Sequence, residues 1–128
     1  MSARIQETPR HRRGYWEARP GDVIGRSDLL FVDVRTDAEA LVGDFGHIHG
    51  VTHVPAAIVL ERGLEGIAPE APVVLVCGNG RESARCAEAL VRLHGFTEVY
   101  LLVGGMVRWV AEARPVARKP TFKATASR

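Results

Sequence analysis

Three short apolar runs divide the chain at intervals. They are LLFVDV at 29–34, VVLV at 73–76 and VYLL at 99–102, and they are continuous rather than alternating with polar positions. Strands that helices cover on both faces of a parallel sheet have this pattern. We therefore predict three central strands of a parallel sheet at these positions.

A helical pattern fills the interval between the last two runs. Within ESARCAEALVRLHG at 82–95, Ala84, Ala87 and Val91 share one helical face, and Gly95 provides a left-handed stop. Weaker helical patterns are found at 22–25, 37–42 and 106–113. This alternation of strands and helices predicts an α/β fold with a central, mostly parallel sheet flanked by helices.

The composition is typical of one soluble domain. The chain has 128 residues, 46% hydrophobic and 25% charged, and no apolar run approaches the length of a membrane span. Residues 1–14 carry four Lys or Arg and one acid, and residues 114–128 carry five Lys or Arg and no acid. We predict basic, solvated tails at 1–14 and 114–128 around a domain at 15–113. We expect no nucleic-acid binding, because no nucleic-acid recognition pattern accompanies these tails.

The N-terminal segment lacks the apolar stretch that a secretory signal needs. We therefore expect a cytoplasmic protein in which the two cysteines, Cys77 and Cys86, remain free thiols. The histidines His47, His49 and His53 lie in a turn-rich stretch with no cysteine or paired acid at metal-binding spacing. We therefore predict no metal site.

Cys77 occupies a position where chemistry is expected. It follows the run at 73–76, so it stands at the carboxyl end of a predicted central strand, where ligands of open α/β sheets bind. Gly78 and Gly80 allow a sharp turn whose backbone N–H groups face inward, and the next helix begins near Arg81. These features favour a thiolate over a thiol and indicate a nucleophile at Cys77.

Cys77 has two other interpretations, a core residue and a phosphatase nucleophile. A free cysteine is often simply a small buried core residue. A cysteine phosphatase loop closes with an arginine six positions after the nucleophile, but that position is Ser83 here and Arg85 comes two residues too late. The loop therefore lacks the main phosphate-binding side chain of phosphatases.

Four motifs in order resemble a known family. They are FVDVR at 31–35, GHIHGVTHVP at 46–55, CGNGRES at 77–83 and LHGFTEVYLLVGGMVRW at 93–109. Over about residues 20–113 the chain resembles a single-domain rhodanese, the sulfurtransferase fold. The resemblance implies an α/β rhodanese domain in which Cys77 is the sulfur-carrying nucleophile.

The resemblance also implies roles for neighbouring residues. The substrate-binding loop would comprise Gly78, Asn79, Gly80, Arg81, Glu82 and Ser83. The residues expected to brace the pocket are Asp33, Arg35, Glu39 and His47. Cys77 would take a sulfur atom from thiosulfate, a persulfide or a polysulfide and pass it to cyanide, a thiol or a sulfur-accepting protein. No metal or organic cofactor is expected, because the cysteine itself carries the sulfur.

Several positions depart from the family pattern. Relative to that pattern, two residues are inserted before Gly46, Ala40 replaces an aromatic residue, and Glu82 places a carboxylate inside the loop. If Glu82 and Glu39 face the cleft they oppose Arg81, and a dianion such as thiosulfate is then held less well. We therefore expect persulfide or polysulfide donors to be nearly as favoured as thiosulfate.

The alternative function is a rhodanese-like binding or regulatory module that recognises a protein partner with little catalysis. A buried Cys77 would favour this alternative. We interpret Cys86 and Trp109 as core residues, since Cys86 falls on the apolar helix face and Trp109 anchors the last helix.

Overall fold

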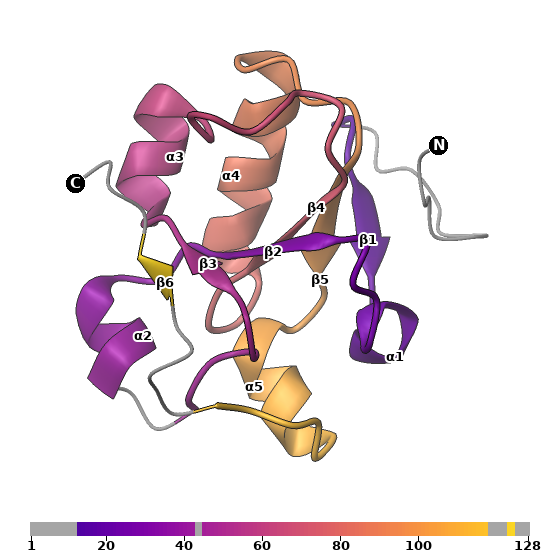
Figure 1. The fold of residues 1–128 in the computed structure, drawn as a ribbon, viewed down its shortest axis with the longest axis vertical. Helices are drawn as coiled ribbons and strands as arrows, with labels where there is room; N and C mark the ends of the chain where they lie inside the picture. Colours follow the sequence, from indigo (N-terminus) through magenta and orange to yellow (C-terminus); the bar gives the residue numbers. More distant parts are fainter. Residues whose placement is uncertain (1–12, 43–44, 118–122, 125–128) are drawn as a thin grey trace.

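A computed structural model of the chain describes residues 13–42, 45–117 and 123–124 (Figure 1). The strands are β1 (Trp16–Ala18), β2 (Leu30–Asp33), β3 (Thr52–His53), β4 (Val73–Val76), β5 (Val99–Leu102) and β6 (Lys123–Ala124). The helices are α1 (Pro20–Val23), α2 (Asp37–Val42), α3 (Ala56–Arg62), α4 (Arg81–Arg92) and α5 (Gly105–Ala111). The predicted α/β fold is confirmed.

The strands form one sheet in the order β1-β5-β4-β2-β3-β6. Every neighbouring pair in this order is parallel. The carboxyl ends of β2, β4 and β5 therefore meet at one edge, and the loops that follow them can build a shared site.

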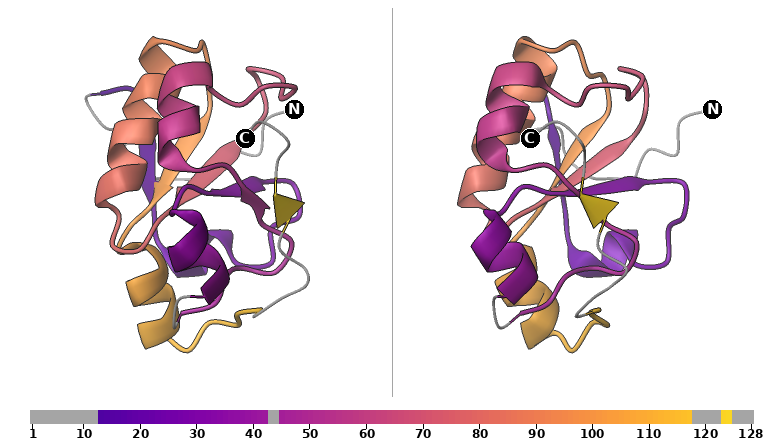
Figure 2. Two further views of the ribbon diagram at one scale, coloured as in Figure 1. Left: turned by 90° about the vertical axis from the view of Figure 1, so that its left-hand side faces the viewer. Right: turned by 60° about the vertical axis from the view of Figure 1, so that its left-hand side comes forward.

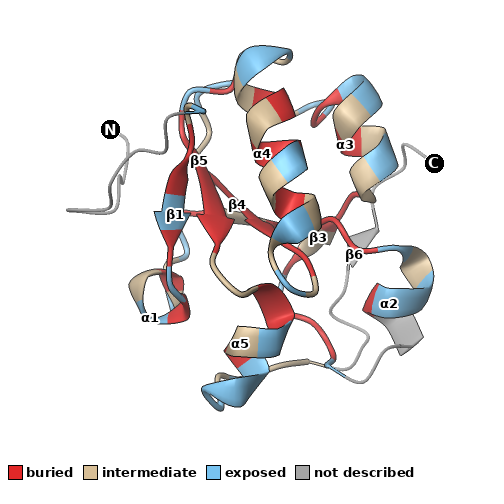
Figure 3. Ribbon diagram, turned by 180° about the vertical axis from the view of Figure 1, so that it is seen from behind, coloured by how far each residue is buried: buried red, intermediate tan, exposed pale blue. Residues whose placement is uncertain are grey.

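The side chains of β4 alternate between two cores on opposite faces of the sheet. Val73 and Leu75 belong to the core that α3 and α4 cover, whereas Val74 and Val76 belong to the core that α1 and α5 cover. Figure 2 shows α3 and α4 side by side, and Figure 3 shows β4 and β5 buried between the layers. All four β4 residues are 0% exposed. Burial on both faces explains the continuous apolar run.

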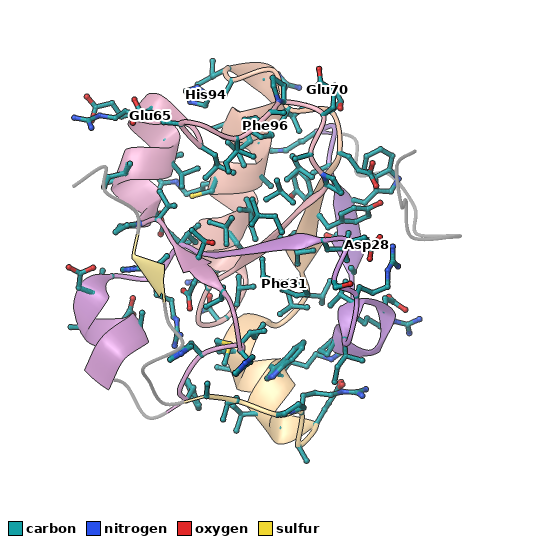
Figure 4. All side chains as sticks on the ribbon, viewed as in Figure 1. Asp28, Phe31, Glu65, Glu70, His94 and Phe96 are labelled. Carbon is teal, nitrogen blue, oxygen red and sulfur yellow. The ribbon has the colours of Figure 1, made fainter. Side chains whose placement is uncertain are left out.

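Two phenylalanines mark these cores in Figure 4. Phe96 is buried in the core beneath α3 and α4, whereas Phe31 is half-buried against the core of α1 and α5. Phe96 also closes the end of α4, because its N–H donates to the Leu90 carbonyl at 2.9 Å across Gly95, whose φ is +77°. This is the left-handed stop that the sequence predicts.

The ends of two predicted helices differ in the structure. Helix α1 begins at Pro20 rather than near 22, because proline suits the first helical position and the Asp22 carboxylate accepts a hydrogen bond from the Arg19 N–H at 3.0 Å. Helix α5 ends at Ala111 rather than Ala113, because Ala113 has a φ of +58°.

Four elements were not predicted from the sequence. Strands β1, β3 and β6 contain only two or three residues each, too few to show a period. Helix α3 lies between Pro55 and Gly63, and Gly63 ends it with a φ of +71°. The proline and the glycine were available as start and stop signals for this helix.

Part of the predicted C-terminal tail contacts the domain. His47 and Ala117 exchange backbone hydrogen bonds of 2.7 and 2.8 Å, and β6 pairs with β3. Residues 1–12, 43–44, 118–122 and 125–128, which include parts of both predicted tails and of the predicted insertion before Gly46, lie outside the described residues. The boundaries of the tails therefore stay a prediction. None of the helices in the described ranges combines the length and apolar character needed to cross a membrane.

Candidate functional site

Cys77 directly follows β4 at the carboxyl edge of the sheet. Its Sγ accepts hydrogen bonds from the backbone N–H groups of Gly80 at 3.0 Å and Ser83 at 3.3 Å. The thiol also donates to the Ser83 hydroxyl at 3.3 Å. Cys77 is only 2% exposed, yet it lines an open pocket. Converging backbone donors of this kind stabilise an anion at the sulfur position.

The loop from Cys77 to Ser83 is held by its own polar groups. The Ser83 hydroxyl donates to the Gly80 carbonyl at 3.2 Å, and the Asn79 side-chain oxygen accepts from the Arg81 N–H at 3.0 Å. Gly80 has a φ of +97°, which a side chain would disfavour. The left-handed turn at Gly80 brings its N–H to the sulfur.

Helix α4 begins directly after this loop. Its first turn runs from Arg81, and Gly80 is the residue before it. The first N–H groups of a helix lack intrahelical partners, so the Ser83 N–H is available for the sulfur of Cys77. The positive end of the twelve-residue helix adds to the same effect.

The first turn of helix α5 holds the loop at Cys77 and Gly78 through backbone hydrogen bonds. The N–H of Met106 donates to the Cys77 carbonyl at 2.8 Å, and the N–H of Val107 donates to the Gly78 carbonyl at 2.9 Å. A Cβ on Gly105 would collide with the Cys77 carbonyl oxygen. The glycine is therefore required for the close approach of α5 to the loop.

A pocket of about 680 Å³ opens beside Cys77. Its loop side is formed by Gly78, Asn79, Arg81 and Glu82, which the sequence predicts as substrate-binding residues. Its other walls are formed by Val34, Arg35, Thr36, Glu39, Pro55, Ala56, Ala57 and Val107. The structure thus brings segments after β2, β3, β4 and β5 together around one sulfur.

The charged residues at the pocket are largely paired with others. Glu82 forms an ion pair of 2.7 Å with the exposed Arg85. Glu39 accepts hydrogen bonds from the N–H of Thr36 at 3.1 Å and from its hydroxyl at 3.2 Å. Both glutamates border the pocket, as does Arg81. The arginine is therefore accompanied by two carboxylates.

Asp33 and Arg35 form a buried ion pair beneath the pocket. Arg35 Nη2 lies 2.7 Å from Asp33 Oδ2, and the two side chains are 3% and 1% exposed. The same guanidinium donates to the Gly46 carbonyl at 2.7 Å and to the Glu39 carbonyl at 3.4 Å. The pair therefore joins β2 to α2 and to the loop before β3, as expected of bracing residues.

His47 is buried next to this ion pair. Its backbone pairs with Ala117, and the residue is 0% exposed. Burial lowers the pKa of His47, while Asp33 opposes and Arg35 reinforces this shift. His47 does not line the pocket described above. Its position suits a brace rather than a group that touches substrate.

Cys86 and Trp109 are core residues, as the sequence predicts. Cys86 is 0% exposed, and burial raises the pKa of its thiol to about 12. The buried Trp109 ring donates from Nε1 to the Pro115 carbonyl at 2.8 Å. Within the part of the chain that the structure describes, no group of three or more potential metal ligands is found.

Two parts of the site are not predicted by the sequence. The first is the clamp by the Met106 and Val107 amides, whose only signal was the pair Gly104 and Gly105 after a strand. The second is the wall formed by α3 next to Pro55, because α3 itself was not predicted.

Comparison with known proteins identifies the family. The Rhodanese-like domain family model matches residues 22–112. The chain is 38% identical over 85 residues to the Bacillus subtilis protein YqhL, described as uncharacterized, and the match covers 66% of this chain and 64% of YqhL. It is 33% identical over 90 residues to the thiosulfate sulfurtransferase GlpE of Coxiella burnetii, covering 70% of this chain and 79% of GlpE.

The fold agrees with this match. The crystal structure of a rhodanese-related protein from Thermoplasma volcanium superposes with a TM-score of 0.69 at 24% identity, covering 80% of this chain and 98% of that one. The chain spans less than two thirds of the length of YqhL. Because the family model covers more than half of the sequence, the chain belongs to the rhodanese-like domain family.

Proposed function

We propose that this protein is a sulfurtransferase that carries sulfane sulfur as a persulfide on Cys77. The observation that carries the proposal is the convergence of the Gly80 and Ser83 N–H groups on the Cys77 Sγ beside an open pocket. The relationship to a protein named thiosulfate sulfurtransferase supports it. The site lies in the cytoplasm in this proposal, and its substrates are a sulfane-sulfur donor and an acceptor.

The first half-reaction loads the cysteine. The Cys77 thiolate attacks the outer sulfur of thiosulfate or of a persulfide, and a new S–S bond forms while the S–S bond of the donor breaks. The leaving group, sulfite or a thiolate, takes the electron pair of the broken bond. The Gly80 and Ser83 amides hold the sulfur of Cys77 in place for this attack.

The second half-reaction transfers the terminal sulfur of the Cys77 persulfide to an acceptor. Cyanide, a thiol or a sulfur-accepting protein attacks the terminal sulfur of the Cys77 persulfide, and Cys77 leaves as a thiolate. The same amides stabilise this thiolate as a leaving group. The loop therefore serves both halves, and the cysteine itself carries the transferred atom without a metal or an organic cofactor.

Phosphate ester hydrolysis is a weaker candidate for this loop. The position six residues after Cys77 is Ser83, whose hydroxyl binds within the loop. Arg85 is directed to Glu82 in a 2.7 Å ion pair. The loop thus lacks an arginine at the position where a phosphatase would bind the phosphate.

A binding module is the second candidate, and one observation favours it. Cys77 is only 2% exposed, so a donor must approach its sulfur along the pocket rather than meet it at the surface. In this alternative the pocket recognises a partner protein and Cys77 acts only as a core residue.

Steady-state thiocyanate formation from cyanide separates the two candidates. The purified protein is assayed with thiosulfate and, separately, with glutathione persulfide, and Cys77→Ser serves as the inactive control. The sulfurtransferase predicts turnover with at least one donor that Cys77→Ser abolishes. Absence of turnover with both donors in a folded protein would support the binding module.

A further inference from the structure

His53 is a buried histidine at the end of β3. The residue is 1% exposed, and it does not line the pocket beside Cys77. A buried imidazole has two polar nitrogens, and contacts with polar groups of the protein offset the loss of water around them. The groups that face the two nitrogens therefore show which parts of the chain His53 connects.

Both nitrogens of His53 face the segment that follows β2. Nε2 lies 2.7 Å from the Arg35 carbonyl oxygen. A carbonyl oxygen only accepts hydrogen bonds, so Nε2 carries a proton and donates it to this bond. Nδ1 lies 3.5 Å from the Oδ1 of Asp37, the first residue of α2. The imidazole thus joins the end of β3 to the turn between β2 and α2.

This turn forms one wall of the pocket, through Val34, Arg35, Thr36 and Glu39. The Thr36 N–H donates to the Glu39 carboxylate at 3.1 Å, and the Glu39 N–H donates to the Thr36 hydroxyl at 3.2 Å. These two bonds fix Thr36 and Glu39 relative to each other, but both lie within the turn. The bond from His53 comes from a different strand and ties the turn to the sheet.

The side chain and the backbone of Arg35 are anchored separately. Its guanidinium binds the Asp33 carboxylate and the Gly46 carbonyl, both at 2.7 Å. Its own carbonyl is held by His53. Because the peptide group is planar, a contact at the carbonyl of residue 35 also fixes the direction in which residue 36 begins.

We propose that His53 is a positioning residue for the pocket wall. Through the Arg35 carbonyl it sets the direction in which Thr36 and Glu39 face the pocket, and it does not itself touch the sulfur donor. This inference rests on the proposed function of Cys77, because the wall affects the reaction only if a donor binds beside it.

The sulfur of Cys77 is held by other contacts. The Gly80 and Ser83 N–H groups donate to it, and the Met106 N–H donates to the Cys77 carbonyl. These groups belong to the loop before α4, to α4 and to α5. Loss of the His53 bond should therefore move the wall and weaken donor binding, while the sulfur stays in place for attack. Such a change raises KM and leaves kcat unchanged.

Two amide substitutions of different reach test this role. The amide nitrogen of glutamine can occupy the position of the imidazole Nε2, so His53→Gln keeps a donor for the Arg35 carbonyl. Asparagine is one methylene shorter, and its amide nitrogen reaches only the position of Nδ1. We expect His53→Asn to raise the donor KM about fivefold to tenfold with kcat within about twofold, as for the loss of one hydrogen bond, and His53→Gln to keep KM within about twofold of the unsubstituted protein.

His94 provides the matched control. Its Nε2 lies 3.2 Å from the Leu60 carbonyl, which is the same kind of contact, and neither residue lines the pocket beside Cys77. His94→Asn and His53→Asn should both lower the midpoint of urea denaturation, but His94→Asn should leave the donor KM unchanged. KM and kcat are measured by thiocyanate formation at saturating cyanide, with thiosulfate and with glutathione persulfide.

The outcomes separate this inference from the proposed function. Equal donor KM values in His53→Asn and the unsubstituted protein, a raised KM in folded His53→Gln, or the same rise in KM in His94→Asn would each overturn the positioning role. Sulfur transfer by Cys77 would then still stand. Absence of turnover in the unsubstituted protein with both donors would overturn the proposed function and this inference together.

Discussion

The backbone N–H of Gly80 lies 3.0 Å from the Sγ of Cys77, three residues earlier in the chain. This contact depends on a φ of +97° at Gly80, which only glycine adopts without strain. The most distinctive feature of the loop is therefore a backbone conformation rather than a side chain.

Gly80→Ala tests this relationship. The loop would hold the alanine in a left-handed conformation, and its Cβ would lie 3.4 Å from the Gly104 nitrogen. We therefore expect the free energy of unfolding to decrease by roughly 1–2 kcal/mol. The rate of sulfur transfer should also fall, and by more than the loss of stability accounts for, because the residue 80 N–H is displaced from the Cys77 sulfur. Urea denaturation and the thiocyanate assay measure the two effects.

Gly66→Ala is the matched control for this variant. Gly66 has a φ of +82°, and a Cβ there meets nothing within 4 Å. The stability loss should be similar, with sulfur transfer unchanged in the folded protein. Equal loss of transfer in both variants would show that the Gly80 amide has no special role.

Ser83→Ala removes the hydroxyl that lies 3.3 Å from the Cys77 sulfur and 3.2 Å from the Gly80 carbonyl. The backbone N–H of residue 83 remains, so the loop keeps both of its amide contacts to the sulfur, from residues 80 and 83. We expect sulfur transfer to fall about threefold to tenfold, in line with the loss of one hydrogen bond of about 1 kcal/mol. An unchanged kcat/KM would mean that the amides alone hold the sulfur. Ser27→Ala, on an exposed residue outside this pocket, is the control.

Arg35→Gln should destabilise the whole domain. It leaves the Asp33 carboxylate buried without its ion-pair partner, and the loss of one member of a buried pair typically costs about 3–5 kcal/mol. The double variant Asp33→Asn/Arg35→Gln should recover part of this loss, because no charge then remains unpaired. Chemical denaturation of both variants provides the measurement, and additive losses would argue against the coupling.

The pH dependence of stability should include a contribution from His47. Burial lowers its pKa in the folded state, so the unfolded chain binds a proton more readily as the pH falls. The stability that neutral His47 contributes is present above about pH 6.5 and is lost as the pH falls through the lowered pKa. His47→Gln should therefore weaken the decrease in unfolding free energy between neutral and mildly acidic pH. An unchanged slope would assign that decrease to other groups.

The two cysteines should differ in reactivity. Both residues are buried, but Cys77 lines a pocket, whereas Cys86 lies in the core and its pKa is raised to about 12. Iodoacetamide near neutral pH should modify Cys77 in the folded protein and leave Cys86 intact until denaturant is added. Peptide mapping after alkylation identifies the modified residue. Modification of Cys86 first would contradict the assignment of the nucleophile.

The sequence predicted the parts of the site that are local in the chain. The run Val73–Val76 followed by Cys77, Gly78 and Gly80 was enough to place the loop, because a parallel strand and a glycine turn each have a sequence pattern. The clamp of Met106 on the Cys77 carbonyl was not predictable in the same way. It joins residues far apart in sequence, and no pattern along the chain reports that the N-terminus of α5 lies against this loop.

The ion-pair partners of the charged residues were also not predictable from the sequence. Glu82 and Glu39 were expected to oppose Arg81, and all three border the pocket. The sequence did not show that Glu82 pairs with Arg85, because surface side chains of a helix have several neighbours to choose from. The charge balance of the site therefore became clear only from the structure.

The most direct test of the central claim is intact mass spectrometry of the reduced protein after exposure to a sulfane-sulfur donor. Thiosulfate and glutathione persulfide are used separately, with Cys77→Ser in parallel and cyanide added afterwards. The account predicts a gain of one sulfur atom that is absent in Cys77→Ser and lost on cyanide treatment. No gain from either donor, or the same gain in Cys77→Ser, would contradict it.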